Sequence, residues 1–125
     1  MEYKKLQKLD LEGSLPAINE IIANSKTHWS KYSRIKKNNT SVVALACLSQ
    51  RIKPIEKSVK ILFSHYCKNK RRDPDNVAGG SQKIILDGLV KAEILKNDTF
   101  EFVNSLHHEF ELDKKNPRIE VFLYE

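Results

Sequence analysis

The fold is decided by residues 59–92, which read VKILFSHYCKNKRRDPDNVAGGSQKIILDGLVKA and change from a strand pattern to a helix pattern across a short polar turn. Apolar residues alternate with others through residues 59–67 and occupy both faces, which predicts a strand at the centre of a sheet. Pro74 fixes its own backbone and keeps Asp73 extended, so the chain must turn there. Apolar residues then recur at helical spacing through residues 77–92.

The beginning of this helix is expected inside the polar turn. Asp75 or Asn76 is suited to cap it, because a short polar side chain can accept a hydrogen bond from the first free N–H groups of a helix. Gly79-Gly80 lowers the helix propensity of the first turns. We therefore expect regular helix only from about Ser81.

The rest of the chain adds three strands and further helix. Alternation, spacing and turn residues predict an edge strand over residues 3–12 that ends at Gly13-Ser14, a brief helix or turn after Pro16, a longer helix over about residues 30–50, a half-exposed strand over residues 106–113, and a last strand with Ile119, Val121 and Leu123 on one face. The order β, α, β, α, β, β predicts one α+β domain over residues 1–125, with helices packed on a mixed β-sheet.

Charge is divided unevenly along the chain. Residues 1–72 hold 16 Lys and Arg against 5 Asp and Glu, a net +11, while residues 73–125 hold 6 against 11, a net −5. A basic surface is what a polyphosphate partner requires, because each neutralised phosphate releases counterions. The alternative is a lysine-rich face that is merely solvated, and charge by itself does not decide between the two.

Composition favours a folded protein of the cytoplasm. Hydrophobic residues make up 40% of the 125 residues and charged residues 30%, which is typical of a globular domain rather than of a disordered chain. The longest apolar run, Val42–Leu48, is far shorter than the ~20 residues that cross a bilayer, and the N-terminus lacks the apolar core of a signal peptide. Cys47 and Cys67 make no disulfide framework and are expected as free thiols. We expect a cytoplasmic protein with no membrane partner.

Two carboxylates follow the predicted central strand. Asp73 and Asp75 are two residues apart, so in an extended segment both side chains would fall on the same face, where they repel unless a cation lies between them. Oxygen ligands of this kind suit Mg²⁺, for which Mn²⁺ can substitute. An ordinary turn with a helix cap is the alternative. Four cationic side chains directly upstream favour the metal site, because they could hold a phosphodiester against it: Lys68, Lys70, Arg71 and Arg72.

Three runs in a fixed order resemble the RusA family of Holliday junction resolvases. They are residues 72–76 (RDPDN), residues 83–89 (KIILDGL) and residues 95–98 (LKND), which are similar to that family's Asp-x-Asp-Asn, Lys-x-x-x-Asp-x-Leu and downstream Asp. Residues 15–20 (LPAINE) look like the N-terminal segment of phage-type members, and residues 116–121 (NPRIEV) look like their final strand. The resemblance therefore covers nearly the whole chain.

The resemblance implies a RusA-like fold and a homodimeric, Mg²⁺-dependent endonuclease that binds branched DNA. Such an enzyme resolves four-way junctions by paired nicks in opposing strands, in recombination and repair. The family's catalytic, metal-binding carboxylates correspond to Asp73, Asp75 and Asp98, its active-site lysine to Lys83, and the asparagine beside the acidic pair, expected to contact DNA, to Asn76. Residues 79–82 make this region longer than in the shortest members of the family.

Other interpretations of these residues, and other functions, stay open at this point. Asp87 lies four residues after Lys83, so the two can form an ordinary ion pair on a helix, and the same pairing could orient the lysine toward a phosphate. Asp87 is left out of the metal set. His107 and His108 should point to opposite faces of their strand, so they cannot bind one ion together and we do not expect a zinc site.

The competing functions are a non-catalytic DNA-binding regulator and a general metal-dependent nuclease that acts on flaps or branched DNA. A homodimer could form through the Val42–Leu48 face or the final strand.

Overall fold

The elements follow the predicted order in a computed structural model, which describes residues 5–13 and 29–124. They are β1 (Lys5–Glu12), α2 (Trp29–Ser49), β2 (Val59–Cys67), α3 (Pro74–Lys91), β3 (Val103–Leu112) and β4 (Arg118–Tyr124). The α+β prediction is confirmed. The brief helix or turn predicted after Pro16 lies outside the described residues, and no described helix has the length and apolar character needed to cross a membrane.

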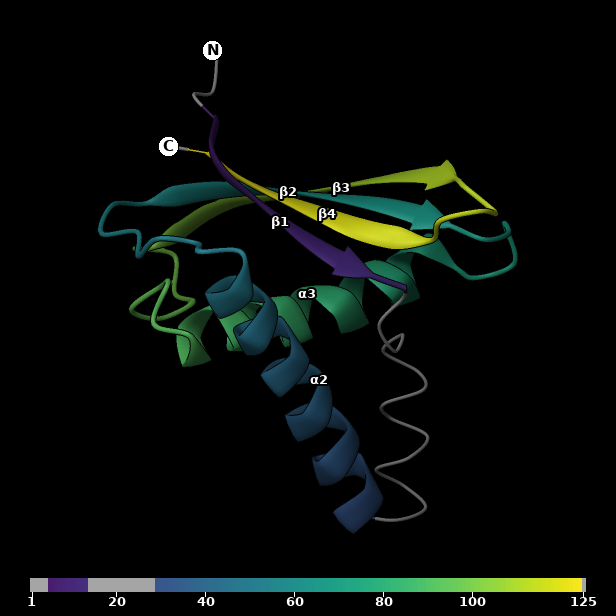
Figure 1. Cartoon of the computed structure of the whole chain (residues 1–125), viewed down its shortest axis with the longest axis horizontal. Helices are drawn as coiled ribbons and strands as arrows, with labels where there is room; N and C mark the ends of the chain where they lie inside the picture. Colours follow the sequence, from purple (N-terminus) through teal and green to yellow (C-terminus); the bar gives the residue numbers. More distant parts are fainter. Residues whose placement is uncertain (1–4, 14–28, 125) are drawn as a thin grey trace.

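A four-stranded mixed sheet forms one layer, in the order β1-β4-β2-β3. β2 pairs in parallel with β3 and antiparallel with β4, while β1 pairs antiparallel with β4. The prediction of a central strand over residues 59–67 is therefore confirmed, and β1 lies at an edge as expected. Both helices lie on the same side of the sheet (Figure 1). Because β2 and β3 are parallel, α3 must carry the chain back along the whole sheet between them.

The core lies between this sheet and the two helices. Every second residue of β2 and β4 is buried against the helices, as the alternation predicts. The fully or almost fully buried side chains include Leu9, Phe63, Ile84, Leu89 and Val121. Cys47 and Cys67 are free cysteines, and burial raises the pKa of Cys47 to about 11, so its thiol stays protonated near neutral pH.

The two helices approach closely at Gly88. A Cβ atom at this position would lie 2.4 Å from Cγ1 of Val43 on α2. Carbon atoms in contact normally stay ~3.5–4.0 Å apart, so only glycine allows the helices this separation.

Helix α3 begins earlier than the sequence indicated. Asp73 is its N-cap and Pro74 its first residue, so the expectations of a cap at Asp75 or Asn76 and of regular helix from Ser81 were wrong. Gly80 and Ser81 are buried, and Ser81 Oγ donates to Val77 O at 2.7 Å. Tertiary packing of this turn outweighs the low helix propensity of two glycines. β3 also begins earlier, three residues before the predicted Leu106.

Candidate functional site

Asp73 and Asp75 lie side by side at the beginning of α3. Asp73 has an extended backbone, with φ −72° and ψ 121°, and its Oδ1 accepts a hydrogen bond from the N–H of Asp75 at 3.3 Å. Asp75 belongs to the first helical turn, so the expectation that both residues share one extended segment was wrong. Both side chains are exposed. The N-terminal end of a helix favours negative charge, which stabilises Asp75 there.

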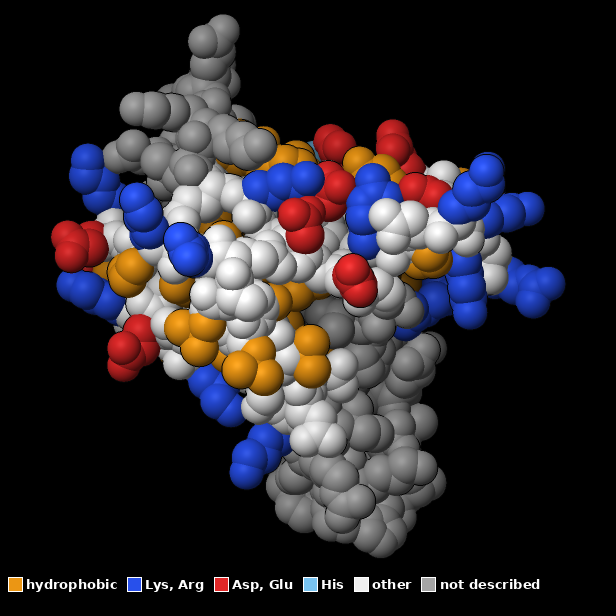
Figure 2. All heavy atoms as spheres, viewed as in Figure 1, with side chains coloured by type: hydrophobic (Ala, Val, Ile, Leu, Met, Phe, Trp, Pro, Cys, Tyr) orange, Lys and Arg blue, Asp and Glu red, His pale blue; other side chains and the backbone are white. Residues whose placement is uncertain are grey.

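The predicted cationic residues form the loop between β2 and α3. Lys68, Lys70 and Arg71 are exposed, and Arg72 is partly exposed. The loop is shaped by Asn69, whose Oδ1 accepts from the N–H of Arg71 at 3.0 Å. Lys and Arg side chains gather at the end of the molecule where β2 ends (Figures 1 and 2). The acidic pair therefore follows directly on a cluster of positive charge, and Asn76, partly buried, lies in the helical turn beside them.

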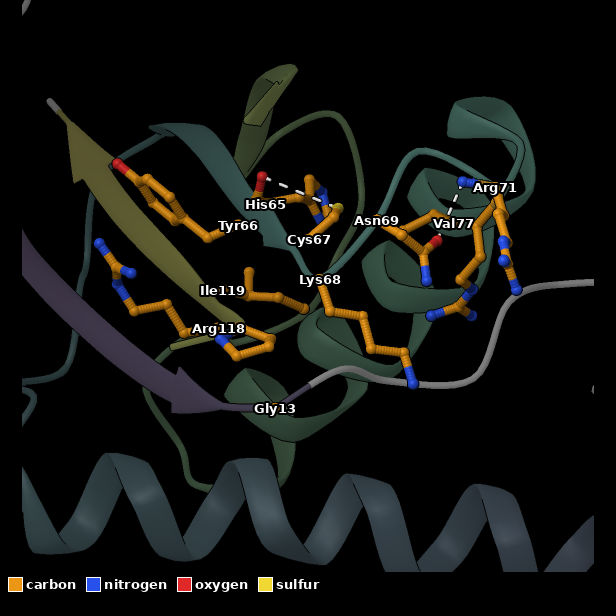
Figure 3. A pocket seen from close by; sticks show the side chains of 12 residues that line it. Gly13, His65, Tyr66, Cys67, Lys68, Asn69, Arg71, Val77, Arg118 and Ile119 are labelled. Carbon is orange, nitrogen blue, oxygen red and sulfur yellow. Dashed lines mark hydrogen bonds between the residues drawn. The ribbon is translucent and has the colours of Figure 1, made fainter. Parts of the chain in front are cut away.

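A cavity of about 430 Å³ opens beneath this loop. Its lining includes Lys68, Arg71 and Arg72 from the loop, with Val77 of α3 and Ile119 of β4 (Figure 3). Cationic and apolar side chains thus share one concave surface, which is the kind of site that holds an anionic ligand with an apolar part.

Lys83, Asp87 and Asp98 form a second charged cluster. Lys83 Nζ lies 3.1 Å from Asp87 Oδ1 and 3.9 Å from Asp98 Oδ2. Lys83 follows Asp75 by eight residues, which at ~1.5 Å per helical residue separates their backbones by ~12 Å. The cluster therefore lies beside the middle of α3, and not at its beginning. Residues 79–82 are part of α3 and add about one turn, or ~6 Å, between the acidic pair and Lys83.

A single chain does not bring the three predicted carboxylates together. Among residues 5–13 and 29–124, no three His, Cys, Asp or Glu side chains are close enough to hold one metal ion. The reason is the direction of the strands. Asp73 and Asp75 follow the end of β2, whereas Asp98 precedes the start of β3, and in a parallel pair these points are at opposite ends of the sheet (Figure 1).

A buried histidine pair was missed in the sequence. His65 is 2% exposed, and its Nε2 lies 2.8 Å from Nδ1 of His108, whose Nε2 lies 2.9 Å from Oε1 of Gln82. Because Gln82 Oε1 can only accept, His108 donates to it and His65 donates to His108. This leaves His65 Nδ1 buried and without a hydrogen-bond partner in the part of the chain that the structure describes. His107 and His108 do face opposite sides of β3, since His107 is exposed.

Burial disfavours the protonated form of both histidines. Loss of solvation, with smaller effects of the neighbouring His108 and of the positive charge on Arg72, lowers the pKa of His65 to about 4. Loss of solvation also lowers the pKa of His108. The rings stack with aromatic neighbours: His108 with Phe63 at 4.4 Å, and His65 with Phe110 at 4.6 Å between centroids. The alternation of residues 59–67 places His65 on the inner face of the strand, and this pattern could have indicated from the sequence that His65 is buried.

Arg118 organises the opposite face of the sheet. Its guanidinium pairs with Asp113 and Glu120, each at 2.8 Å, and lies 3.8 Å above the ring of Tyr66. Hydrogen bonds from Arg118 lower the pKa of both carboxyl groups. These charges are mutually satisfied, so we assign them to the stability of the strand ends and not to catalysis.

No family model and no curated protein matches the chain.

Proposed function

We propose that this protein is a Mg²⁺-dependent, structure-specific DNA endonuclease of the RusA kind, which resolves four-way junctions by paired nicks in opposing strands. The observation that carries the proposal is the pair Asp73 and Asp75, exposed at a helix N-terminus directly beside four cationic side chains. A binding surface for DNA gains nothing from carboxylates among its phosphate contacts, because they repel the backbone unless a cation neutralises them.

The acidic pair fits the ligand set that Mg²⁺ takes in proteins, namely one or two carboxylates together with waters and substrate phosphate oxygens. One oxygen of Asp73 is used in the helix cap, so the ion would be held by its other oxygen and by Asp75. Bound there, Mg²⁺ would supply an activated water and stabilise charge on the leaving oxygen. Asp98 does not fit this set within one chain.

The chain's own residues would position the substrate. Lys68, Lys70, Arg71 and Arg72 would contact phosphates on both sides of the scissile bond, and such contacts fix the register of the duplex without reading its sequence. The cap hydrogen bond fixes the Asp73 carboxylate before DNA arrives, so it need not be ordered during binding. We propose that these residues act in the cytoplasm.

One observation supports a second candidate. Because Asp98 and Lys83 lie away from the acidic pair, a single subunit lacks the complete catalytic set that the family resemblance implies. A non-catalytic DNA-binding regulator would tolerate this separation. A general metal-dependent nuclease would need the same metal chemistry and would differ only in the DNA shape that it prefers.

Cleavage of labelled DNA of three shapes separates these functions. The full chain would be incubated with a four-way junction, a linear duplex and a flap, each with Mg²⁺ and with a chelator. We expect the junction alone to be cut efficiently, and only with Mg²⁺. Equal cutting of flap and junction would favour the general nuclease, and tight binding to the junction without cutting would favour the regulator.

A further inference from the structure

The cavity beneath the loop between β2 and α3 has two unlike sides. Lys68, Arg71 and Arg72, which we call the loop cations, line it from the loop, whereas Val77 of α3 and Ile119 of β4 line it from the core. Lys68 and Arg71 lie on one side of the cavity and Ile119 on the side of the sheet (Figure 3). Its volume of about 430 Å³ falls within the range of small-molecule sites. The cavity is therefore large enough for an organic ligand.

The positive charge of the cavity comes from the loop. No Asp or Glu belongs to the lining among the described residues. Arg118 also lines the cavity, but Asp113 and Glu120 neutralise its guanidinium, which lies over the ring of Tyr66. A phosphate monoester carries about two negative charges near neutral pH and offers several acceptor oxygens, so it can bind more than one cationic side chain at once. The loop cations therefore suit a phosphate better than a single carboxylate.

The inner wall of the cavity carries a hydrogen-bond acceptor. His65 lines the cavity and is paired with Ile119 across β2 and β4. Its Nε2 is turned toward His108 of β3, so its Nδ1, on the other side of the ring, faces β4. The chain of donors that ends at Gln82 leaves Nδ1 unprotonated, and Nδ1 has no partner within the described part of the chain. An N–H group of a ligand would supply the donor that this nitrogen lacks.

We propose that this cavity is a nucleotide pocket, in which the phosphate binds the loop cations and the base enters the apolar interior toward His65. A nucleotide combines what the lining requires: a doubly charged phosphate, a flat ring with apolar faces, and N–H groups on the edge of that ring. Inorganic phosphate would leave the apolar wall in contact with water. A fatty acid would use only part of the positive charge. The pocket goes beyond the proposed nuclease, because it binds its ligand whether or not the chain cuts DNA.

The nucleotide can come from two sources. It can be free in solution, or it can belong to a DNA strand that lies on the same loop, with its base turned out of the stack. Proteins hold unstacked bases by apolar contact and by hydrogen bonds to the edge of the base, as this lining would do. Both sources therefore offer the same chemistry to the pocket, and experiment has to separate them.

Cys67 makes occupancy of the pocket measurable. It is partly exposed and lines the cavity, whereas the other cysteine, Cys47, is buried. Iodoacetamide should therefore alkylate Cys67 and spare Cys47, as followed by mass spectrometry on the full chain. Deoxyadenosine monophosphate at ~10 times its Kd should slow this alkylation about 10-fold, because only the unliganded protein reacts. Equal protection by inorganic phosphate alone or by deoxyadenosine alone would overturn the proposal, as would no protection by up to ~10 mM nucleotide.

Two substitutions of one residue test where the ligand lies. Cys67→Phe adds a ring inside the cavity, and Cys67→Ser, the matched control, leaves the cavity open. In calorimetric titration, Cys67→Ser should bind deoxyadenosine monophosphate as wild type does, and Cys67→Phe at least ~10-fold more weakly, because its ring occupies the space for the base. Wild-type affinity in a folded Cys67→Phe protein would refute the pocket.

A second substitution tests the phosphate contact and does not depend on whether Cys67→Phe folds. Arg71→Ala should weaken binding of the same nucleotide about 10-fold or more, through loss of a charge-assisted hydrogen bond. Lys96→Ala, an exposed lysine in the turn after α3, is the matched control and should bind as wild type. Equal affinities of the two variants would contradict a phosphate held by the loop cations.

A labelled junction separates the two sources. 2-Aminopurine, an adenine analogue that fluoresces more strongly when it is unstacked, would be placed beside the branch point of a four-way junction. A rise in fluorescence with wild type and Cys67→Ser, but not with Cys67→Phe at equal junction binding, identifies a base of the bound strand as the occupant. No rise, or an equal rise with all three proteins, leaves the free nucleotide as the occupant. None of these readings requires cleavage, so an inactive enzyme would refute only the proposed function, whereas loss of Cys67 protection by nucleotide would refute only the pocket.

Discussion

The buried histidine pair should make the fold sensitive to acid. His65 has an ordinary pKa of 6.5 in the unfolded chain and a pKa of about 4 in the folded protein. Above pH 6.5 both states are neutral at this residue. As the pH falls below 6.5 the unfolded chain takes up a proton that the folded protein does not, so the free energy of unfolding decreases until the folded pKa is passed.

The size of the effect follows from this difference in pKa. Near pH 4.5 the expected loss from His65 is about 2–3 kcal/mol, at ~1.4 kcal/mol for each pKa unit between the two states. That is a large share of the ~5–15 kcal/mol that stabilises a domain. His108 should add to the loss, because burial lowers its pKa as well. Protonation of His65 would place a charge in a buried position, and a new N–H on Nδ1, which has no hydrogen-bond partner among the described residues.

Urea unfolding near pH 7 and about pH 4.5 measures this loss. We expect His65→Gln to be less stable than wild type near neutral pH, because ring stacking with Phe110 is lost, but to lose less stability on acidification. His107→Gln, at an exposed neighbouring histidine, should keep the wild-type pH dependence. The reasoning fails if wild type and His65→Gln lose the same stability between the two pH values.

Three other predictions follow from packing and charge. Gly88→Ala should lower the free energy of unfolding, measured in urea, by about 1–3 kcal/mol, because its Cβ would overlap Val43. A stability within ~0.5 kcal/mol of wild type would mean that the two helices can move apart at little cost. Asp73→Ala should cost about 1 kcal/mol of stability by loss of the helix cap, whereas Asp75→Asn loses only the interaction of its charge with the helix end and should cost less. Equal shifts in a thermal unfolding experiment would contradict the cap. Arg71→Ala combined with Arg72→Ala should weaken binding to DNA of every shape and reduce the slope of log affinity against log salt concentration by about 2. An unchanged slope in a fluorescence anisotropy titration would mean that this loop is solvated and does not contact phosphates.

The strands were predictable because burial on one or both faces leaves a period of two in the sequence. β2 and β4 alternate so regularly that Phe63 and Val121 could be assigned to the core without a structure. The beginning of α3 could not be predicted in the same way. Gly79 and Gly80 are poor helix formers, and only their packing in the folded protein, with Gly80 buried, shows why the helix continues through them.

The site was predictable only where it is local in sequence. Asp73, Asp75 and the cationic loop are consecutive, so their proximity follows from the chain itself. The position of Asp98 depends instead on the direction of β3 relative to β2, which the sequence does not state. The contact between His65 and His108 depends on the register that sets Phe63 against His108. Both are long-range consequences of how strands pair.

The central claim is that Asp73 and Asp75 form a metal-dependent nuclease site, and one paired measurement on a single variant tests it most directly. Cleavage and binding of a labelled four-way junction would be followed for wild type and Asp75→Asn in Mg²⁺. Glu56→Gln is the matched control, an exposed carboxylate near the start of β2, at the other end of the sheet. We predict that Asp75→Asn cuts at least ~100-fold more slowly, as loss of a metal ligand requires. It should bind the junction as tightly as wild type or more tightly, because a negative charge beside the phosphates is gone, and Glu56→Gln should behave as wild type in both. Cleavage by Asp75→Asn at the wild-type rate would contradict the account.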